Sequence, residues 1–227
     1  MEKIKKALAN NGKYWIAFTG DSITSTEWVH PNWREIVEYV LKDNFEYDWG
    51  IKTFNFAYDG STSRDLLEKV DELSLIKPDM VIMLTGSNDP FHGEVSPNEL
   101  KDNVIKIKKT VEDVGADFVI SSDTCPMDKW AEEKCLPYVE ALNSIDNNSI
   151  KLFEASKAFP QERIFTFIAE QDIPEERVVK GKTDFWHPNQ LGNAYIAKVI
   201  LEKIWGIEFN PEKYIEETLK GEKMPKY

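Results

Sequence analysis

Short apolar runs alternate with longer amphipathic stretches along most of this chain, and this alternation strongly limits the fold it can adopt. Four runs rich in β-branched and aromatic residues end in Gly, Asp, Ser or Asn: WIAFTG (15–20), IKTFNFAYDG (51–60), MVIMLTGSND (80–89) and FVISSD (118–123). Such runs are typical of central strands buried on both faces. Helical periodicity covers residues 31–43, 63–76, 97–114 and 189–205, and a further helix is expected near 131–146. Strands that alternate with helices predict an α/β fold with a parallel sheet between two layers of helices.

The segment 123–183 has a weaker pattern. IKLFEAS (150–156) is a candidate fifth strand, and IFTFIA (164–169) fits either a strand or a helix. The segment is longer than a strand-helix-strand connection requires. We therefore expect it either to carry a lid or specificity loop that contains Met127 and Trp130, or to cover the sheet edge.

The length of 227 residues suits a single α/β domain over residues 1–227, with a core at about 14–205 and a polar tail at 206–227. No internal repeat or Pro/Gly-rich linker divides the chain. The charged, amphipathic start lacks the apolar stretch of a secretory signal, and no run approaches the roughly 18 apolar residues of a membrane span. A cytoplasmic protein is expected.

The charge balance excludes some classes of partner. Forty acidic residues against 28 basic ones give a net charge of -12, which repels nucleic-acid phosphates and anionic lipid headgroups. Cys125 and Cys135 lie ten positions apart without zinc-ligand partners, so two reduced thiols and no metal site are expected. The sequence leaves the oligomeric state open.

The first apolar run ends in Gly20-Asp21-Ser22, a turn that brings Ser22 to the edge of the sheet where parallel α/β proteins bind ligands. Serine is also a preferred helix N-cap, so this tripeptide alone fits a structural role. A serine hydroxyl at the start of a helix would have a free backbone N–H beside it. Catalysis additionally requires a base.

Three histidines are candidates for that base. His30 and His92 lie in turn-like stretches and are interpreted as exposed loop residues. His187 follows Asp184 by three residues, just before a helix. This spacing lets the Asp184 carboxylate fix the His187 tautomer and leaves the other ring nitrogen to face Ser22. A surface Asp and His ahead of a helix are the structural alternative.

Two further strand ends offer hydrogen-bond donors. Asn88 follows the third run and Gly60 follows the second. Together with the Ser22 N–H, the Gly60 N–H and the Asn88 amide would form a three-donor oxyanion hole. Each residue alone is more often a plain turn former.

These blocks resemble the signature of the SGNH (GDSL-type) hydrolases: Gly20-Asp21-Ser22-Ile23, Gly60, Gly86-Ser87-Asn88-Asp89 and Asp184-Phe185-Trp186-His187. The resemblance spans about residues 14–205. It implies a three-layer α/β/α sandwich with a mostly parallel, flavodoxin-like central sheet. Asp59, before Gly60, departs from the small neutral residue common in the family, and strand alternation would turn its carboxylate away from the site.

The resemblance implies Ser22 as nucleophile, His187 as base, Asp184 as its orienting acid, and Asp21 as a structural residue of the first loop. Gly60, Asn88 and the Ser22 amide are the implied oxyanion donors. No cofactor or metal is required.

Two tryptophans lie near these blocks. Trp28 and Trp186 would form an aromatic wall for a sugar or acyl group, although packing in the core or at its rim is the alternative. The competing motifs G-x-S-x-G, H-E-x-x-H and the P-loop are absent from the sequence.

The predicted function is hydrolysis of acyl or O-acetyl esters of carbohydrates or small molecules through an acyl-enzyme. An acyltransferase with the same residues and a non-catalytic carbohydrate-binding or scaffold module are the alternatives.

Overall fold

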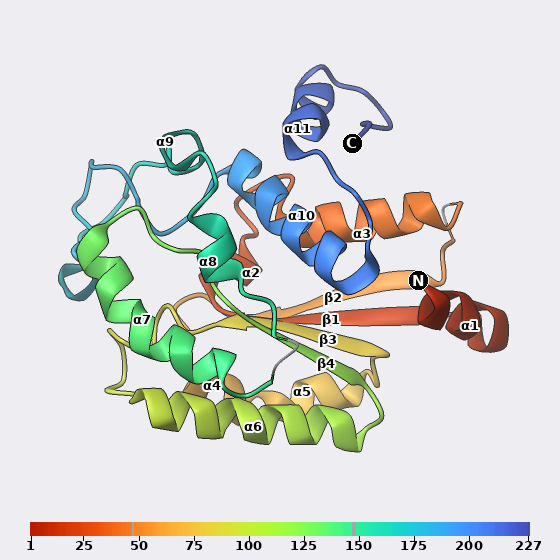
Figure 1. Cartoon of the computed structure of the whole chain (residues 1–227), viewed down its shortest axis with the longest axis horizontal. Coiled ribbons are helices and arrows are strands. Elements are labelled where there is room, and N and C mark those ends of the chain that lie inside the picture. Colours follow the sequence, from red (N-terminus) through yellow and green to blue (C-terminus); the bar gives the residue numbers. More distant parts are fainter. Residues whose placement is uncertain (47, 147–148) are drawn as a thin grey trace.

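A computed structural model of the chain describes residues 1–46, 48–146 and 149–227. Its parallel sheet contains β1 (Tyr14–Gly20), β2 (Ile51–Ala57), β3 (Met80–Thr85) and β4 (Asp117–Ser122). The strands lie in the order β2-β1-β3-β4, so β2 and β4 form the edges (Figure 1). All four runs predicted as strands are confirmed, and their carboxyl ends share one edge of the sheet.

Helices cover both faces of the sheet, which confirms the predicted α/β/α arrangement. One face carries α4 (Ser63–Glu68), α5 (Val70–Leu75) and α6 (Pro97–Asp113), and the other carries α3 (Trp33–Asn44) and α10 (Gln190–Trp205) (Figure 1). The stretch predicted as one helix at 63–76 is two helices that meet at Lys69. Further elements are α1 (Glu2–Asn11), α2 (Ser22–Ser25), α7 (Lys129–Asn143), α8 (Leu152–Ser156), α9 (Gln161–Ile164), the 3₁₀ helix η1 (Pro174–Glu176) and α11 (Pro211–Leu219).

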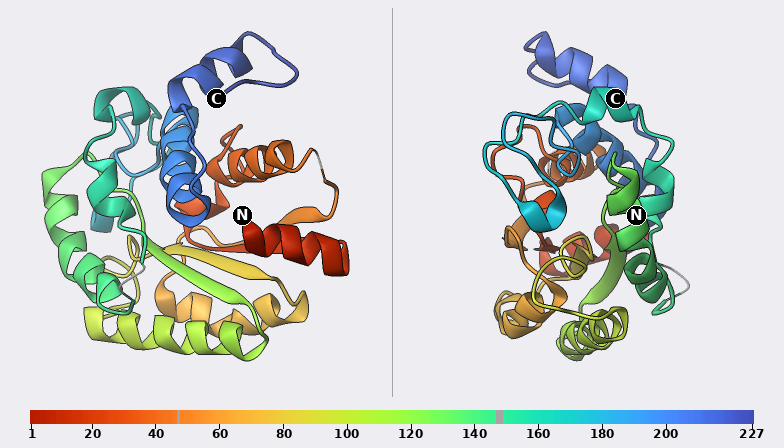
Figure 2. Two further views of the ribbon diagram at one scale, coloured as in Figure 1. Left: turned by 45° about the vertical axis from the view of Figure 1, so that its right-hand side comes forward. Right: turned by 90° about the vertical axis from the view of Figure 1, so that its left-hand side faces the viewer.

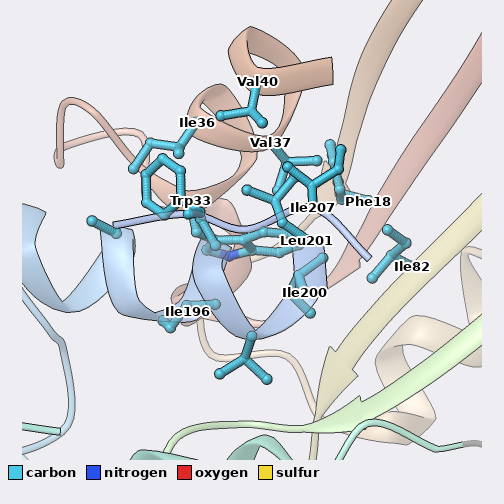
Figure 3. Close-up of a cluster of buried hydrophobic side chains, with 14 of the residues drawn as sticks. Phe18, Trp33, Ile36, Val37, Val40, Ile82, Ile196, Ile200, Leu201 and Ile207 are labelled. Atoms are coloured by element: carbon cyan, nitrogen blue, oxygen red, sulfur yellow. The ribbon is translucent and has the colours of Figure 1, made fainter. Parts of the chain in front are cut away.

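Successive side chains of the buried strands point to opposite faces of the sheet and pack into two separate cores. In β1, Ile16 and Phe18 join the cluster under α3 and α10, whereas Ala17 joins the cluster under α4, α5 and α6. The larger core packs the fully buried Trp33 edge-on against Phe18, with ring centroids 4.8 Å apart. Figure 3 shows this cluster between α3, α10 and the strands. Two packed faces fix the positions of the strand ends that form the site.

Two sequence expectations about elements in the segment 123–183 were wrong. Residues 150–156 are not a strand: Ile150 makes one parallel bridge to Ser121, and α8 begins at Leu152. The run 164–169 is neither strand nor helix, since α9 ends at Ile164 and Ile168 makes an isolated bridge to Thr183. Short apolar runs do not identify an element by periodicity alone.

The stretch 206–227 is more than a polar tail. It contains α11, which Asn210 caps by accepting a hydrogen bond of 3.1 Å from the Lys213 N–H. Phe209 and Tyr214 are buried and belong to the core cluster beside α10. In Figure 2, α11 lies on the outer side of α10, close to the C-terminus. A few buried aromatic residues are enough to hold this otherwise charged segment in place.

Candidate active site

Ser22 lies where β1 passes into α2. Gly20 has a φ of 148°, and a Cβ atom there would lie 2.0 Å from the Leu84 carbonyl oxygen of the neighbouring strand. Only glycine therefore permits this close turn. Asp21 caps α2, because its carboxylate accepts a 3.1 Å hydrogen bond from the Ile23 N–H. As the first residue of α2, Ser22 has a backbone N–H with no acceptor within the helix.

Asp184 and His187 lie in the loop that leads into α10. The Asp184 carboxylate accepts hydrogen bonds from the backbone N–H groups of Trp186 (2.8 Å) and His187 (3.1 Å). Its second oxygen is 2.7 Å from His187 Nδ1. These local bonds hold the imidazole in one orientation. Asn189 then starts α10 by accepting from the N–H groups of Leu191 and Gly192.

The two loops meet, since His187 Nε2 lies 2.8 Å from Ser22 Oγ. The structure thus brings Ser22, His187 and Asp184 into a continuous hydrogen-bonded chain across 165 residues of sequence. Burial lowers the pKa of His187, but the hydrogen bond and charge of Asp184 outweigh it, so the net pKa rises above the usual 6.5. Burial raises the pKa of Asp184, and His187 reverses this to a net decrease.

Asn88 and Gly60 border the same pocket as Ser22. The Asn88 side chain is buried and donates one N–H to the Ser61 carbonyl at 3.0 Å. A primary amide has a second N–H, which this contact leaves for another acceptor. Gly60 has a φ of 71°, a backbone conformation that favours glycine. The bond from Asn88 to Ser61 links the loop after β3 to the loop that holds Gly60.

Asp59 is not turned away from the site, contrary to the expectation from strand alternation. It lines the pocket beside Gly60, and its carboxylate accepts a hydrogen bond from Ser25 Oγ. The alternation ends with β2 at Ala57, so it does not govern the orientation of Asp59. An exposed carboxylate therefore borders the site.

Three buried carboxyl groups, those of Asp21, Asp89 and Asp123, form hydrogen bonds that hold the loops of the site. Ser87 Oγ donates to Asp21 at 2.8 Å, and the Ser87 N–H donates to Asp123 at 3.1 Å. This agrees with the structural role expected for Asp21. Burial and the charge of Asp123 raise the pKa of Asp21 well above its usual range, and burial raises the pKa of Asp123 to about 6. Burial also raises the pKa of Asp89, which Ser63 holds, to about 6.

The contribution of these carboxyl groups to stability should depend on pH. The pKa of Asp123 is raised from 3.8 to about 6 in the folded state, so its stabilising contribution is full below pH 3.8 and is lost as the pH rises through 6. The side-chain amide of an Asp123→Asn variant would stay neutral and still accept from the Ser87 N–H. We compare the Tm difference, variant minus wild type, at two pH values. We expect this difference to be larger at pH 8 than at pH 5 by about 2–4 °C or more.

The control for this measurement is Asp102→Asn, which changes an exposed carboxylate on α6. Its Tm difference from wild type should be the same at both pH values. Thermal unfolding followed by circular dichroism measures both variants. If the Tm difference between Asp123→Asn and wild type is the same at pH 5 and pH 8, the claim that ionisation of the buried Asp123 destabilises the fold is wrong.

The pocket in front of Ser22 has a volume of about 450 Å³, and its far wall combines polar side chains with Ile173. Gln171, Ile173 and Glu176 line it from the segment between α9 and α10, together with His92 from the loop after β3. The loops between α8 and α10 gather on the side that faces the viewer in the right-hand view of Figure 2. Part of the segment 123–183 thus reaches the site, but Met127 and Trp130 are not among the lining residues.

The expectation that His92 is a plain exposed loop residue was wrong. Its Nε2 lies 2.5 Å from the Glu176 carboxylate, whose side chain is nearly buried, and both residues line the pocket. His30 does remain exposed, although it also has a carboxylate neighbour, Glu35, at 3.1 Å. No local sequence pattern indicates the His92–Glu176 pair, because 84 residues separate the two partners.

The two candidate tryptophans differ in exposure. Trp186 is buried and packs edge-on against Phe91, so it mainly forms the floor of the pocket. Trp28 is 49% exposed and lines the pocket, with its ring edge-on to His187 at a centroid distance of 5.9 Å. The Trp28 ring is therefore a part of the pocket wall that is open to solvent.

Cys125 and Cys135 are both free thiols in a buried cluster. Burial raises the pKa of Cys125 to about 12 and that of Cys135 further, so both thiols stay protonated at neutral pH. None of the helices in the described ranges has the length and hydropathy of a membrane span.

Comparison with protein families identifies the class of this protein. The family model described as GDSL-like lipase/acylhydrolase matches residues 16–200. The chain belongs to this family and is a carboxylic ester hydrolase. A search of curated proteins found no significant match.

Solved structures show the same fold at low sequence identity. An acetylxylan esterase from Geobacillus stearothermophilus, solved as a catalytic mutant, has a TM-score of 0.66 at 19% identity over 87% of this chain and 95% of its own. A lipase/acylhydrolase from Enterococcus faecalis has a TM-score of 0.61 at 19% identity over 85% and 96%. An α/β hydrolase from the metagenome of Lake Arreo, Spain, has a TM-score of 0.65 at 16% identity over 84% and 94%.

Proposed function

We propose that this protein cleaves esters by forming an acyl-enzyme on Ser22. In this mechanism Ser22 Oγ attacks the ester carbonyl carbon while its proton moves to His187 Nε2, and Asp184 stabilises the imidazolium. The alcohol leaves with the proton from His187, and water then releases the acid by the reverse path. The observation that carries the proposal is the hydrogen-bonded chain from Ser22 Oγ through His187 to Asp184, with contacts of 2.8 and 2.7 Å.

The negative charge of the tetrahedral intermediate needs fixed donors. We assign this role to the Ser22 N–H, the Gly60 N–H and the remaining N–H of the Asn88 side chain. All three residues line the pocket, and the Asn88 side chain is anchored by Ser61. Such preorganised donors stabilise the transition state without reorganisation during the reaction.

The pocket favours a short acyl group on a polar alcohol. Its wall includes Gln171, His92 and Glu176, which suit hydroxyl groups better than a long hydrocarbon chain. The similar fold of an acetylxylan esterase supports the same class of substrate. We propose O-acetyl esters of carbohydrates or other small acyl esters as substrates.

Release of acetate from 4-nitrophenyl acetate and from O-acetylated xylose tests this proposal. We expect turnover of both, and a decline in kcat/KM from acetyl to butyryl to octanoyl 4-nitrophenyl esters. No turnover of any of these esters by the folded protein would refute the function. Transfer of the acetyl group to added xylose, detected by mass spectrometry of the products, would instead identify an acyltransferase that uses the same residues.

The activity should rise with pH through the pKa of His187. Only the neutral imidazole accepts the Ser22 proton, and the pKa of this group is raised above 6.5, chiefly by Asp184 against the effect of burial. The acidic limb of kcat/KM should therefore have its midpoint above pH 6.5. The charge of Glu176 also raises this pKa, so Glu176→Gln should move the midpoint to lower pH.

A matched control is Glu175→Gln, which neutralises the neighbouring but exposed side chain. Its pH profile should overlay that of the wild type. Initial rates with 4-nitrophenyl acetate between pH 5 and 9 give the midpoints. An unchanged or higher midpoint in Glu176→Gln would show that this carboxylate does not act on the base.

A further inference from the structure

A second hollow adjoins the active-site pocket along the edge strand β2. This strand-edge groove has a volume of about 490 Å³, and Trp28 and Asp59 line both hollows. The two shared residues place the groove directly beside the space in front of Ser22. The groove is lined by Ser25, Glu27, Trp28, Asn55, Ala57, Tyr58 and Asp59.

The indole of Trp28 is an exposed part of the groove. It is 49% exposed, whereas Trp33, Trp186 and Trp205 are all buried. A tryptophan left open to solvent beside a catalytic pocket offers a flat apolar face for a ligand. Its indole carbons suit the C–H face of a sugar ring, while the surrounding polar groups suit the ring's hydroxyls.

Polar groups surround this indole on the side of β2. The Asn55 amide donates to the Glu27 carboxylate at 3.4 Å, and Asp59 accepts from Ser25. Each carboxylate has two oxygens and accepts more than one hydrogen bond, so both can accept further bonds from ligand hydroxyls. Tyr58 forms a fixed wall, since its hydroxyl donates to Glu72.

The charges of the groove select among sugars. Glu27 and Asp59 are exposed carboxylates, and the residues described as lining the groove include no lysine, arginine or histidine. An anionic sugar such as a uronate would be repelled by these groups, whereas a neutral sugar would not. A long acyl chain would leave the carboxylates and the amide without hydrogen-bond partners.

We propose that the strand-edge groove binds a second, neutral sugar unit next to the acetylated one, so that the preferred substrate is an O-acetylated oligosaccharide rather than a monosaccharide. This inference rests on the proposed esterase function. Contacts to a part of the substrate that does not react raise kcat/KM by stabilising the bound transition state. Trp28 and Glu27 would then determine specificity for the length and charge of the alcohol.

The test compares kcat/KM for O-acetylated xylobiose with kcat/KM for 4-nitrophenyl acetate in each variant. This ratio removes any effect of Trp28 on His187, which it contacts. We expect the ratio to fall about tenfold in Trp28→Ala, the size typical of one important binding residue, and severalfold in Glu27→Ala. Trp49→Ala removes a tryptophan that is 80% exposed and lies outside both hollows, and its ratio should equal that of the wild type.

Two further measurements separate the possible outcomes. The kcat/KM of the wild type should be at least tenfold higher for acetylated xylobiose than for acetylated digalacturonate. Calorimetry should show that the Ser22→Ala variant binds unacetylated xylobiose. Adding Trp28→Ala to this variant should weaken the binding. Ratios that stay within twofold of wild type in both groove variants would overturn the subsite and leave the esterase intact. A fall confined to octanoyl esters would assign the groove to an acyl chain. No turnover of any ester would refute the esterase and the subsite together.

Discussion

Replacing Ser22 by alanine is expected to lower kcat for 4-nitrophenyl acetate by about four to six orders of magnitude, the usual effect of removing a catalytic nucleophile. The hydroxyl is only 2.8 Å from His187 Nε2, and among the described residues no other serine forms a hydrogen bond with this ring. His187→Ala should have an effect of similar size, and the double variant should lose little more. This non-additivity is expected when residues act as one unit.

Ser144→Ala is the matched control, because it makes the same chemical change at an exposed site after α7. It should keep full activity. Circular dichroism should show the same fold and a similar Tm for all variants. A Ser22→Ala enzyme that retains near-wild-type turnover would end the proposal that Ser22 is the nucleophile.

Asn88→Ala is expected to lower kcat by about two to three orders of magnitude, the effect of losing one oxyanion donor. KM should change much less, because the lost hydrogen bond is strongest in the transition state. Steady-state kinetics with 4-nitrophenyl acetate separate the two constants.

The alternative role for Asn88 is structural, since its side chain also holds the Ser61 carbonyl. If Asn88 were purely structural, Asn88→Ala would lower Tm but leave kcat within about twofold of the wild-type value. Asn98→Ala, at an exposed position in the first turn of α6, provides the control for the same change of side chain. A twofold loss of kcat in Asn88→Ala would contradict the oxyanion assignment.

The sequence predicted the strand ends and the residues on them well, for a physical reason. Parallel strands deliver Ser22, Gly60 and Asn88 to one edge whatever the details of the helices between them. Asp184 and His187 are close in sequence, so their contact follows from local geometry. Their convergence with Ser22 was predicted from the chemistry of the residue types and from the resemblance to a known family, and not from periodicity.

The far wall of the pocket could not be predicted in the same way. Glu176 meets His92 only because the irregular chain between α9 and α10 folds back toward the loop after β3. Irregular segments carry no periodic pattern that would indicate which side chains face inward. Their positions depend on isolated contacts, such as the bridge between Ile168 and Thr183.

Segments with marginal patterns account for the errors in the fold. Residues 150–156 have the composition of a strand, but only Ile150 reaches β4 before α8 begins. The residues after Gly206 are mostly polar, and yet Phe209 and Tyr214 hold α11 against the core. In both cases tertiary packing decided the structure, and local composition did not.

Covalent labelling with a fluorophosphonate tests the central claim most directly. The probe reacts with a serine only when a neighbouring base activates it and donors stabilise the developing negative charge. We predict one adduct per chain by intact mass, located at Ser22 by peptide mapping, and no adduct in Ser22→Ala. An unlabelled wild-type protein, or an adduct on another residue, would contradict the arrangement of Ser22, His187 and Asp184 as one catalytic unit.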